Sequence, residues 1–376
     1  MGRGSHSGEI VNQLREARLA HGLSQQQVAE RAGVTRQAVN GIEMRRYLPN
    51  AAVALRLAQA LNCRVEDLFH LPMESREHPV LSGAEALETG ERVVLSRVGD
   101  VLVAHPLTGT RAMIEGFQPA DAVATPDGAS VRMLAPEDAP GKTAVLLGCD
   151  PSLTVLVSWV ARTVPHGRLL WLHAASQSAL DALPRGLAHV AGSHLPGQGP
   201  DSNVAPARRA LGRRGGLVVT YAAWEQGLMV APRNPKALRS ATDLARPNVR
   251  IVNREAGSGS RRLLDELLAR DSLAAADITG YTSIVPSHTA VARAVAAGTA
   301  DAGVGLEAVS RSFGLDFVPL TEVRFDLVIP EEHTSHFVIR AMLDVLQGAR
   351  LRTDLAALPG YSTSGTGNVV ARIQAA

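Results

Sequence analysis

The chain has 376 residues, about two to three times the length of a common domain, so several folding units are expected. Apolar residues make up 45% of the sequence and charged residues 20%, a balance that supplies packed cores and excludes a disordered chain. The net charge is only +2, but residues 1–70 hold nine arginines against six acids, while the remainder is nearly neutral. A basic excess at one end predicts a nucleic-acid partner there.

The sequence was searched for membrane-spanning segments, a signal-like apolar core and paired cysteines. No apolar run reaches the roughly 18 residues of a membrane span, and no signal-like apolar core follows Met1. We therefore expect a cytoplasmic protein without membrane association. Cys63 and Cys149 match no disulfide or metal-ligating spacing, so both are expected to be free thiols and no metal site is predicted.

Residues 9–70 are expected to form an all-α head of short helices separated by turns. Ser24 and Gln27 have the spacing of a capping box, in which each side chain binds a free backbone N–H group at a helix start. Gly33 supplies the left-handed residue that ends this helix, and Thr35 caps the next one. Two short capped helices joined by such a turn predict a helix-turn-helix, whose second helix enters the major groove of DNA.

The second of these helices carries polar and basic side chains suited to DNA. Arginine can bind guanine, asparagine and glutamine can bind adenine, and further arginines can meet phosphates. Residues 9–69 resemble the Cro/repressor-type family of bacterial regulators, through LSQQQVAERAGVTRQAVNGIEMRRYLPN and LRLAQALNCRVEDLF. The predicted DNA-binding residues are Gln25, Thr35, Arg36, Gln37, Asn40, Arg45 and Arg46. The alternative is a helical dimerisation module whose polar face is merely solvated.

The rest of the chain divides into two parts by its patterning. Residues 71–140 contain short apolar stretches separated by Gly-Asp and Asp-Gly turns, which predicts a small β-rich connector. In 141–376, strands alternate with amphipathic helices, which is typical of an α/β domain with a mostly parallel sheet. Its length favours two lobes, with ligands at the carboxyl ends of strands. Separate strands are expected at Leu217–Tyr221 and Leu228–Ala231.

One stretch of this domain, Asn253–Arg261, predicts an anion site. A strand runs into Gly-Ser-Gly-Ser at the start of a helix, so backbone N–H groups, hydroxyls and the positive end of the helix dipole meet there. Arg254 and Arg261 add positive charge. The spacing is neither a dinucleotide fingerprint nor a P-loop. An ordinary helix cap is the alternative interpretation.

Similar loops of small and hydroxyl residues follow other predicted strands and would converge on one cleft. The predicted ligand-binding residues are Cys149, Asp150, Ser176, Ser193, His194, Tyr221, Arg254, Gly257, Ser258, Gly259, Ser260, Arg261, Ser287 and His288. Structural roles are alternatives at several positions: helix caps at Asp150 and at Ser287–His288, a strand end at Ser193–His194, and core packing at Tyr221.

Residues 142–370 resemble type 2 periplasmic-binding-protein-like domains, more narrowly those of molybdenum metabolism. The resemblance is carried by HVAGSHL, EQGLMVAPRNPKALRSATDLARPNVRIVNREAGSGSRRLLDELL, HTAVARAVAAGTADAGVGLEAV, LDFVPLTEVRFDLVIP and LPGYSTSGTG. It implies a two-lobed clamp that closes on molybdate, tungstate or a molybdenum-cofactor species as effector, with no cofactor required. The chain departs from the family at Ala174–Ser176, where glycine-rich residues are common.

Catalytic patterns do not stand out: the sequence has no Gly-x-Ser-x-Gly elbow, no His-Glu-x-x-His helix and no evident acid–base carboxylate pair. We therefore expect no enzyme and no catalytic residues. The leading hypothesis is a homodimeric one-component transcriptional regulator that binds double-stranded operator DNA and senses a small anion. The alternatives are an enzyme or cofactor-handling protein of molybdenum-cofactor metabolism with an accessory DNA-binding head, and a scaffold whose head contacts proteins.

Overall fold

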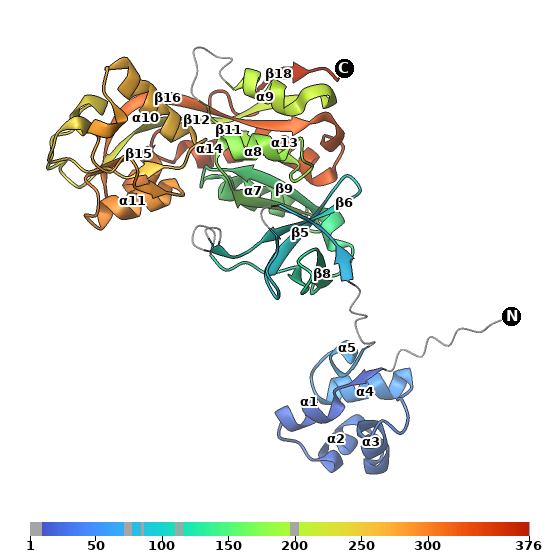
Figure 1. The fold of residues 1–376 in the computed structure, drawn as a ribbon. Coiled ribbons are helices and arrows are strands. Elements are labelled where there is room, and N and C mark those ends of the chain that lie inside the picture. The colour runs from blue at the N-terminus through green and yellow to red at the C-terminus, as the bar shows by residue number, and fades with distance from the viewer. Residues whose placement is uncertain are drawn as a thin grey trace. The chain divides into compact units, whose positions relative to one another are not determined.

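The structure is a computed structural model that describes residues 10–70, 77–83, 86–109, 112, 116–195 and 203–375 (Figure 1). The chain divides into two compact units, Met1–Arg76 and Glu77–Ala376, which are described in turn. Residue 9 and residue 71, at predicted domain boundaries, lie outside the described residues. Among the described helices, none is long and apolar enough to cross a membrane.

The first unit packs short helices around one apolar core. Its elements are β1 (Val11–Asn12), α1 (Leu14–Ala20), α2 (Gln25–Ala32), α3 (Arg36–Glu43), α4 (Ala51–Ala60), α5 (Val65–Leu68) and β2 (Phe69–His70). The predicted capping box is present, because Ser24 Oγ accepts from Gln27 N and Gln27 Oε1 accepts from Ser24 N. Gly33 ends α2 with φ of 62°, and Thr35 caps α3. Local signals therefore determine the sharp turn between α2 and α3.

The second unit begins with a six-stranded sheet of order β3-β8-β7-β5-β6-β4. Its strands are β3 (Glu77–Pro79), β4 (Leu81–Ser82), β5 (Arg92–Val98), β6 (Val101–Pro106), β7 (Ala122–Ala124) and β8 (Ser130–Met133). Val94 of this sheet shares an apolar cluster with Val145 of the α/β region. Arg168 and Asp121 form an ion pair across the same contact. The β-rich segment thus packs directly on the α/β region.

The α/β region has two lobes (Figure 1). The first lobe contains β9 (Thr143–Gly148), α7 (Leu153–Thr163), β10 (Arg168–His173), α8 (Ser176–Ala182), β11 (Val190–Ser193), α9 (Val204–Leu211), α13 (Phe337–Gln347), α14 (Ala349–Ala356), β17 (Tyr361–Ser362) and β18 (Val369–Ile373). The second contains β13 (Asn253–Arg254), α10 (Gly259–Arg270), β14 (Ile284–Val285), α11 (His288–Ala296), β15 (Ala302–Leu306) and α12 (Glu307–Ser312). Two long antiparallel strands, β12 (Gly216–Val230) and β16 (Asp316–Pro330), run through both lobes.

The large sheet, of order β10-β9-β11-β16-β12-β15, is mixed, so the expectation of a mostly parallel sheet is wrong. Strand β9 is parallel to β10 and β11, whereas β16 is antiparallel to β11 and β12, and β12 is antiparallel to β15. The expected strands Leu217–Tyr221 and Leu228–Ala231 are one strand, β12, with two register shifts. The chain crosses from the first lobe to the second along β12 and returns along β16, so these two strands run in opposite directions and pair as antiparallel neighbours.

His189 lies where the six-stranded sheet contacts the first lobe, and its titration makes folding stability depend on pH. His189 Nδ1 accepts from Val145 N at 3.0 Å, so the proton is on Nε2, which lies 3.1 Å from Arg97 O. Burial, with His333 and His336 nearby, lowers the pKa of His189 to about 3. As pH falls below about 6.5, the unfolded chain binds a proton that the folded chain does not, so folding stability declines.

We expect His189→Gln to weaken this acid sensitivity, because glutamine can keep both hydrogen bonds without titrating. The measurement is the thermal unfolding midpoint of the full chain from about pH 7 to about pH 4, where the variant should lose less stability than the wild type. His166→Gln, at an exposed position, is the matched control. Equal declines in the wild type and His189→Gln would contradict this account.

Candidate functional site

Four of the predicted DNA-binding residues, Arg36 and Gln37 at the start of α3 and Arg45 and Arg46 just after its end, are exposed. Arg36 and Gln37 are exposed, beyond the cap formed by Thr35, whose Oγ1 accepts from Ala38 N at 3.1 Å. Arg45 and Arg46 are exposed just after α3 ends, and Arg45 takes a left-handed backbone with φ of 55°. The basic side chains at both ends of this helix are thus available to a partner.

The other two predicted residues of the head, Gln25 and Asn40, form part of a network that joins α2 to α3. Gln25 Nε2 donates to Glu43 Oε2 at 2.7 Å and to Asn40 Oδ1 at 3.3 Å. Arg18 Nε donates to Glu43 Oε1 at 2.6 Å, and this hydrogen bond raises the pKa of Arg18. Burial opposes ionisation of Glu43, yet its bonds with Arg18 and Gln25 hold its pKa below the usual range. The network thus links side chains of α1, α2 and α3.

A second group of predicted residues meets in a buried layer between the lobes. Cys149 follows β9, Ser193 ends β11 and His194 follows it, Arg254 ends β13, and His288 begins α11. Each of the five is at most 2% exposed. His194 Nε2 lies 3.1 Å from Cys149 Sγ, and the ligand atoms of Cys149, His194 and His288 all lie within 4.8 Å of one another. The structure thus brings together residues from four distant segments.

Burial controls the protonation of this layer. It raises the pKa of Cys149 to about 12, although the positive charge of Arg254 acts in the opposite direction. Burial, with Arg254 adding to the effect, lowers the pKa of His194 to about 3 and that of His288 well below its usual range. At neutral pH the layer therefore holds a thiol and two neutral imidazoles beside a guanidinium.

Several buried polar atoms of this layer have no hydrogen-bond partner among the described residues. They are Ser193 Oγ, His194 Nδ1, Trp224 Nε1, Arg254 Nη1 and both ring nitrogens of His288. Trp224 belongs here because its ring lies 5.4 Å from that of His194. An unpaired buried polar group costs about 1–3 kcal/mol, so a cluster of them marks a place for a polar ligand.

The rest of the Arg254 guanidinium is held by its neighbour. Arg254 Nε donates to Glu255 Oε2 at 2.8 Å and Nη2 donates to Glu255 Oε1 at 2.7 Å. Nη2 also donates to Pro286 O at 3.3 Å, just before α11. These bonds orient the side chain and leave Nη1 as the nitrogen without a described partner.

The Gly-Ser-Gly-Ser turn presses the start of α10 against the first lobe. Gly257 O accepts from Gln177 N of α8 at 3.2 Å. Gly259 has no room for a side chain, because an added Cβ would lie 2.2 Å from the carbonyl oxygen of His194 and 2.4 Å from its ring. Glycine at 259 is thus required by close approach between the lobes.

The predicted serines other than Ser193 already have partners in the protein. Ser258 caps α10 by accepting from Arg261 N at 3.2 Å, and Ser287 caps α11 by accepting from Ala290 N at 3.1 Å. Ser260 Oγ accepts from Gln226 Nε2 at 2.7 Å, and Ser176 Oγ accepts from His194 N at 3.2 Å. These four hydroxyls therefore hold the surrounding helices and strands in place through hydrogen bonds within the protein.

Asp150 and Tyr221 belong to a different buried cluster. Asp150 Oδ1 accepts from Ser152 N at 2.9 Å and from Tyr361 OH at 2.6 Å. Tyr221 OH donates to Ser152 O at 2.8 Å. Burial raises the pKa of Asp150 to about 6 in spite of these hydrogen bonds. Both residues have structural partners around the start of α7.

Arg261 is held mainly by residues of the second lobe, and it adjoins the buried layer because its Nη1 donates to Arg254 O at 3.4 Å. Its Nε donates to Asp265 Oδ1 at 3.1 Å, one turn further along α10, and its guanidinium lies 4.0 Å above the ring of Tyr281. The two arginines that flank the Gly-Ser turn thus differ, because Arg254 faces the lobe interface while Arg261 packs within the second lobe.

Two family models match this sequence. Residues 14–68 match the Helix-turn-helix model, and residues 157–347, half of the chain, match the PBP superfamily domain model. The chain belongs to the PBP superfamily domain family. Its N-terminal unit is a helix-turn-helix domain of the Cro type fused to this PBP domain.

Relatives of both parts are known. Over 227 residues the chain is 30% identical to YvgK, an uncharacterized protein of Bacillus subtilis (strain 168), covering 60% of this chain and 73% of YvgK. The head is 39% identical over 66 residues to YgzD, an uncharacterized HTH-type transcriptional regulator of the same organism, covering 18% of this chain and 100% of YgzD. The sulfate-binding protein SubI of Mycobacterium tuberculosis H37Rv aligns with a TM-score of 0.43 and 14% identity, over 58% of this chain and 86% of SubI.

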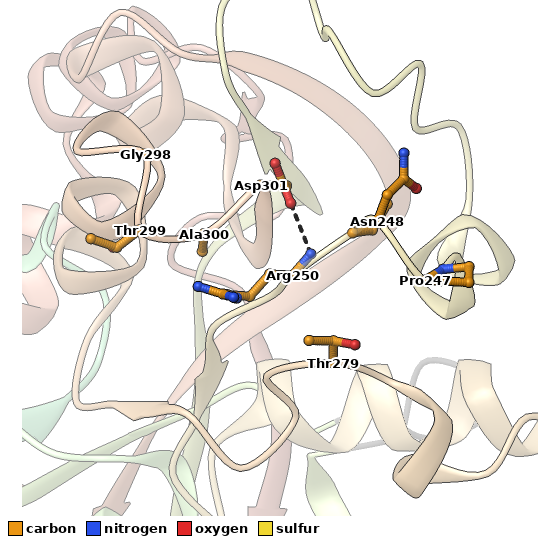
Figure 2. Close-up of a pocket in the computed structure, with 9 residues that line it drawn as sticks. Pro247, Asn248, Arg250, Thr279, Gly298, Thr299, Ala300 and Asp301 are labelled. Carbon is orange, nitrogen blue, oxygen red and sulfur yellow. Dashed lines mark hydrogen bonds between the residues drawn. The ribbon is translucent and has the colours of Figure 1, made fainter.

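The second lobe of the PBP domain also carries a surface pocket of about 210 Å³ (Figure 2). It is lined by Pro247, Asn248, Val249, Arg250, Thr279, Gly298, Thr299, Ala300 and Asp301, and Arg250 N donates to Asp301 Oδ2 at 2.8 Å. No predicted site residue lines this pocket, so it is separate from the buried layer.

Sequence reasoning missed Trp224 and Gln226 of the PBP domain. Both lie in β12, in the part between the two strands that were expected there. Trp224 is 1% exposed and so is Gln226. The signal available in the sequence was the alternation along one strand: Gln226 lies two residues from Trp224 and two from Leu228, so a longer strand would place all three side chains on one face.

Proposed function

We propose that this chain is a ligand-responsive transcription regulator. It binds operator DNA through α3 as a homodimer in the cytoplasm and senses a small anion, with molybdate and tungstate as first candidates, between the lobes of its PBP domain. The observation that carries this proposal is the unpartnered Nη1 of Arg254, buried among further unpartnered donors between the two lobes. The molybdenum compounds enter through the family resemblance of the sequence.

The donor set favours a ligand that accepts hydrogen bonds. A guanidinium, an indole N–H and a hydroxyl supply donors, and a charged donor strengthens each bond to an anion. The nearby carboxylates are already engaged, Glu255 with Arg254 and Asp150 with Ser152. Because the donors come from both lobes, an anion bound there favours the closed form over the open form, and such a differential affinity is what regulation requires.

Base recognition by the head predicts different effects at the two ends of α3. Arg36→Ala should reduce discrimination between operator and unrelated DNA, with about 1–3 kcal/mol lost at the base pair concerned. Arg46→Ala should weaken binding to all DNA alike and reduce the salt slope by about one, because it removes a phosphate contact. The measurement is fluorescence anisotropy with an operator selected from a random-sequence pool, at several salt concentrations.

Arg56→Ala, an exposed arginine of α4 outside the predicted set, is the control for the general loss of positive charge. Binding that does not depend on salt concentration, or equal behaviour of the Arg36 and Arg46 variants, would contradict this assignment of roles.

The identity of the anion is tested by a thermal-shift series with molybdate, tungstate, sulfate, phosphate and molybdenum cofactor. A ligand that binds only the folded chain raises its unfolding temperature in proportion to the logarithm of its concentration. Stabilisation by molybdate or tungstate above that by sulfate supports the proposal in its specific form. If no anion stabilises the chain, the anion proposal fails.

A further inference from the structure

The structure assigns a metal-ligating centre to the layer between the lobes. We propose that Cys149, His194 and His288 together bind one monovalent copper ion. Cys149 Sγ and His194 Nε2 are 3.1 Å apart, and all three ligand atoms lie within 4.8 Å of one another. Ligands at about 2.0–2.3 Å from one ion are about 3.4–3.9 Å apart, so shifts below about 1 Å complete the site.

The two histidines are free to act as ligands. Neither ring nitrogen of His288 has a hydrogen-bond partner among the described residues, and His288 is fully buried. His194 Nε2 has only the cysteine sulfur as partner. A buried histidine normally has a hydrogen-bond partner for its ring. The ring of His288 has none among the described residues and has a ligand atom within 4.8 Å of Cys149 Sγ and of a His194 ring nitrogen, which suits a metal ligand.

The surroundings favour a monovalent, thiophilic ion. Cys149 releases its thiol proton to solvent as the sulfur binds Cu(I), and the resulting Cu(I)–thiolate unit is neutral. A divalent ion in the same place would leave a positive charge buried near Arg254, whose charge already acts on Cys149 and His194. Glu255 offers no compensation, since both its oxygens bind Arg254. Thiolate and imidazole ligands suit Cu(I). Magnesium and calcium prefer oxygen ligands, and none of the three residues supplies a carboxylate.

The site joins the two lobes, because Cys149 and His194 belong to the first lobe and His288 begins α11 of the second. An ion bound by all three residues therefore binds the closed form and not an open one. Copper binding is an activity beyond the anion response proposed above, and it is measured without DNA and without an anion.

The test uses full-length Cys63→Ser protein, in which Cys149 is the only thiol. The reduced protein is titrated without oxygen against a coloured Cu(I) chelator, with zinc titrated in parallel. We expect one equivalent of Cu(I) per chain to leave the chelator, and Cys63→Ser to bind as tightly as the wild type. Cys149→Ser and His288→Gln should each bind at least about 100-fold more weakly.

A measurement on the intact site guards against variants that do not fold. X-ray absorption of the Cu(I)-loaded Cys63→Ser protein should show sulfur and nitrogen ligands together. A spectrum without sulfur, a failure to compete with the chelator, or equal affinity after Cys149→Ser would overturn the proposal. Tighter binding of zinc than of Cu(I) would overturn the choice of metal.

Discussion

Arg254→Gln is expected to weaken anion binding by the PBP domain strongly while leaving DNA binding by the head intact. The substitution removes the charged donor whose Nη1 has no described partner, and it leaves Glu255 without its two hydrogen bonds. A charge-assisted hydrogen bond in a buried site contributes about 1.5–3 kcal/mol, so loss of the whole guanidinium predicts an affinity loss of about 100-fold or more. Isothermal titration with the best anion of the thermal-shift series measures this loss.

Arg261→Gln is the matched control, since Arg261 lies seven residues further along the chain and pairs with Asp265 in the second lobe. It should bind the anion like the wild type. The Arg254 variant is also expected to lose about 1–3 kcal/mol of folding stability from the unpaired Glu255, so titrations belong well below its unfolding temperature. Equal losses of affinity in the two variants would show that Arg254 has no special place in binding.

Gly259→Ala is expected to separate the lobes. The added methyl group would lie 2.2 Å from the carbonyl oxygen of His194, and backbone at that distance cannot move aside without a shift of the lobes themselves. Since the ligand groups come from both sides of this contact, we expect anion affinity to fall by about 100-fold, which is about 2.7 kcal/mol. Small-angle scattering with and without the anion should show a closure in the wild type that the variant does not complete.

Arg262→Ala, at an exposed position of the same first turn of α10, controls for changes in helix stability. It should close and bind normally. A Gly259→Ala protein with wild-type affinity would mean that the close approach of α10 to His194 plays no part in ligand binding.

Local patterns in the sequence predicted local structure well. The capping box of Ser24 and Gln27 and the left-handed Gly33 depend on neighbouring residues only, and the structure confirms them. Such features arise from hydrogen bonds and side-chain periodicity within a few residues, which a single sequence contains.

Long-range packing was harder to predict. Residues 222–227 were expected to separate two strands. Pairing with β16, which lies about 100 residues further along the chain, keeps β12 continuous through them. The different partners of Arg254 and Arg261 were not predicted, because Glu255 had no assigned role in the quoted stretch and Tyr281 lies outside it. Cys149, His194 and His288 have no ligand spacing because each comes from a different element, so only the folded chain brings them together.

The most direct test of the regulator proposal is the affinity of the full chain for its selected operator with and without the stabilising anion. Ionic strength must be matched with chloride, because added salt alone weakens DNA binding. We predict that the anion changes the dissociation constant at least about fivefold in the wild type, which is about 1 kcal/mol of coupling, and leaves the Arg254→Gln protein unchanged. An identical dissociation constant for the wild type with and without saturating anion would contradict the claim that this PBP domain regulates the helix-turn-helix head.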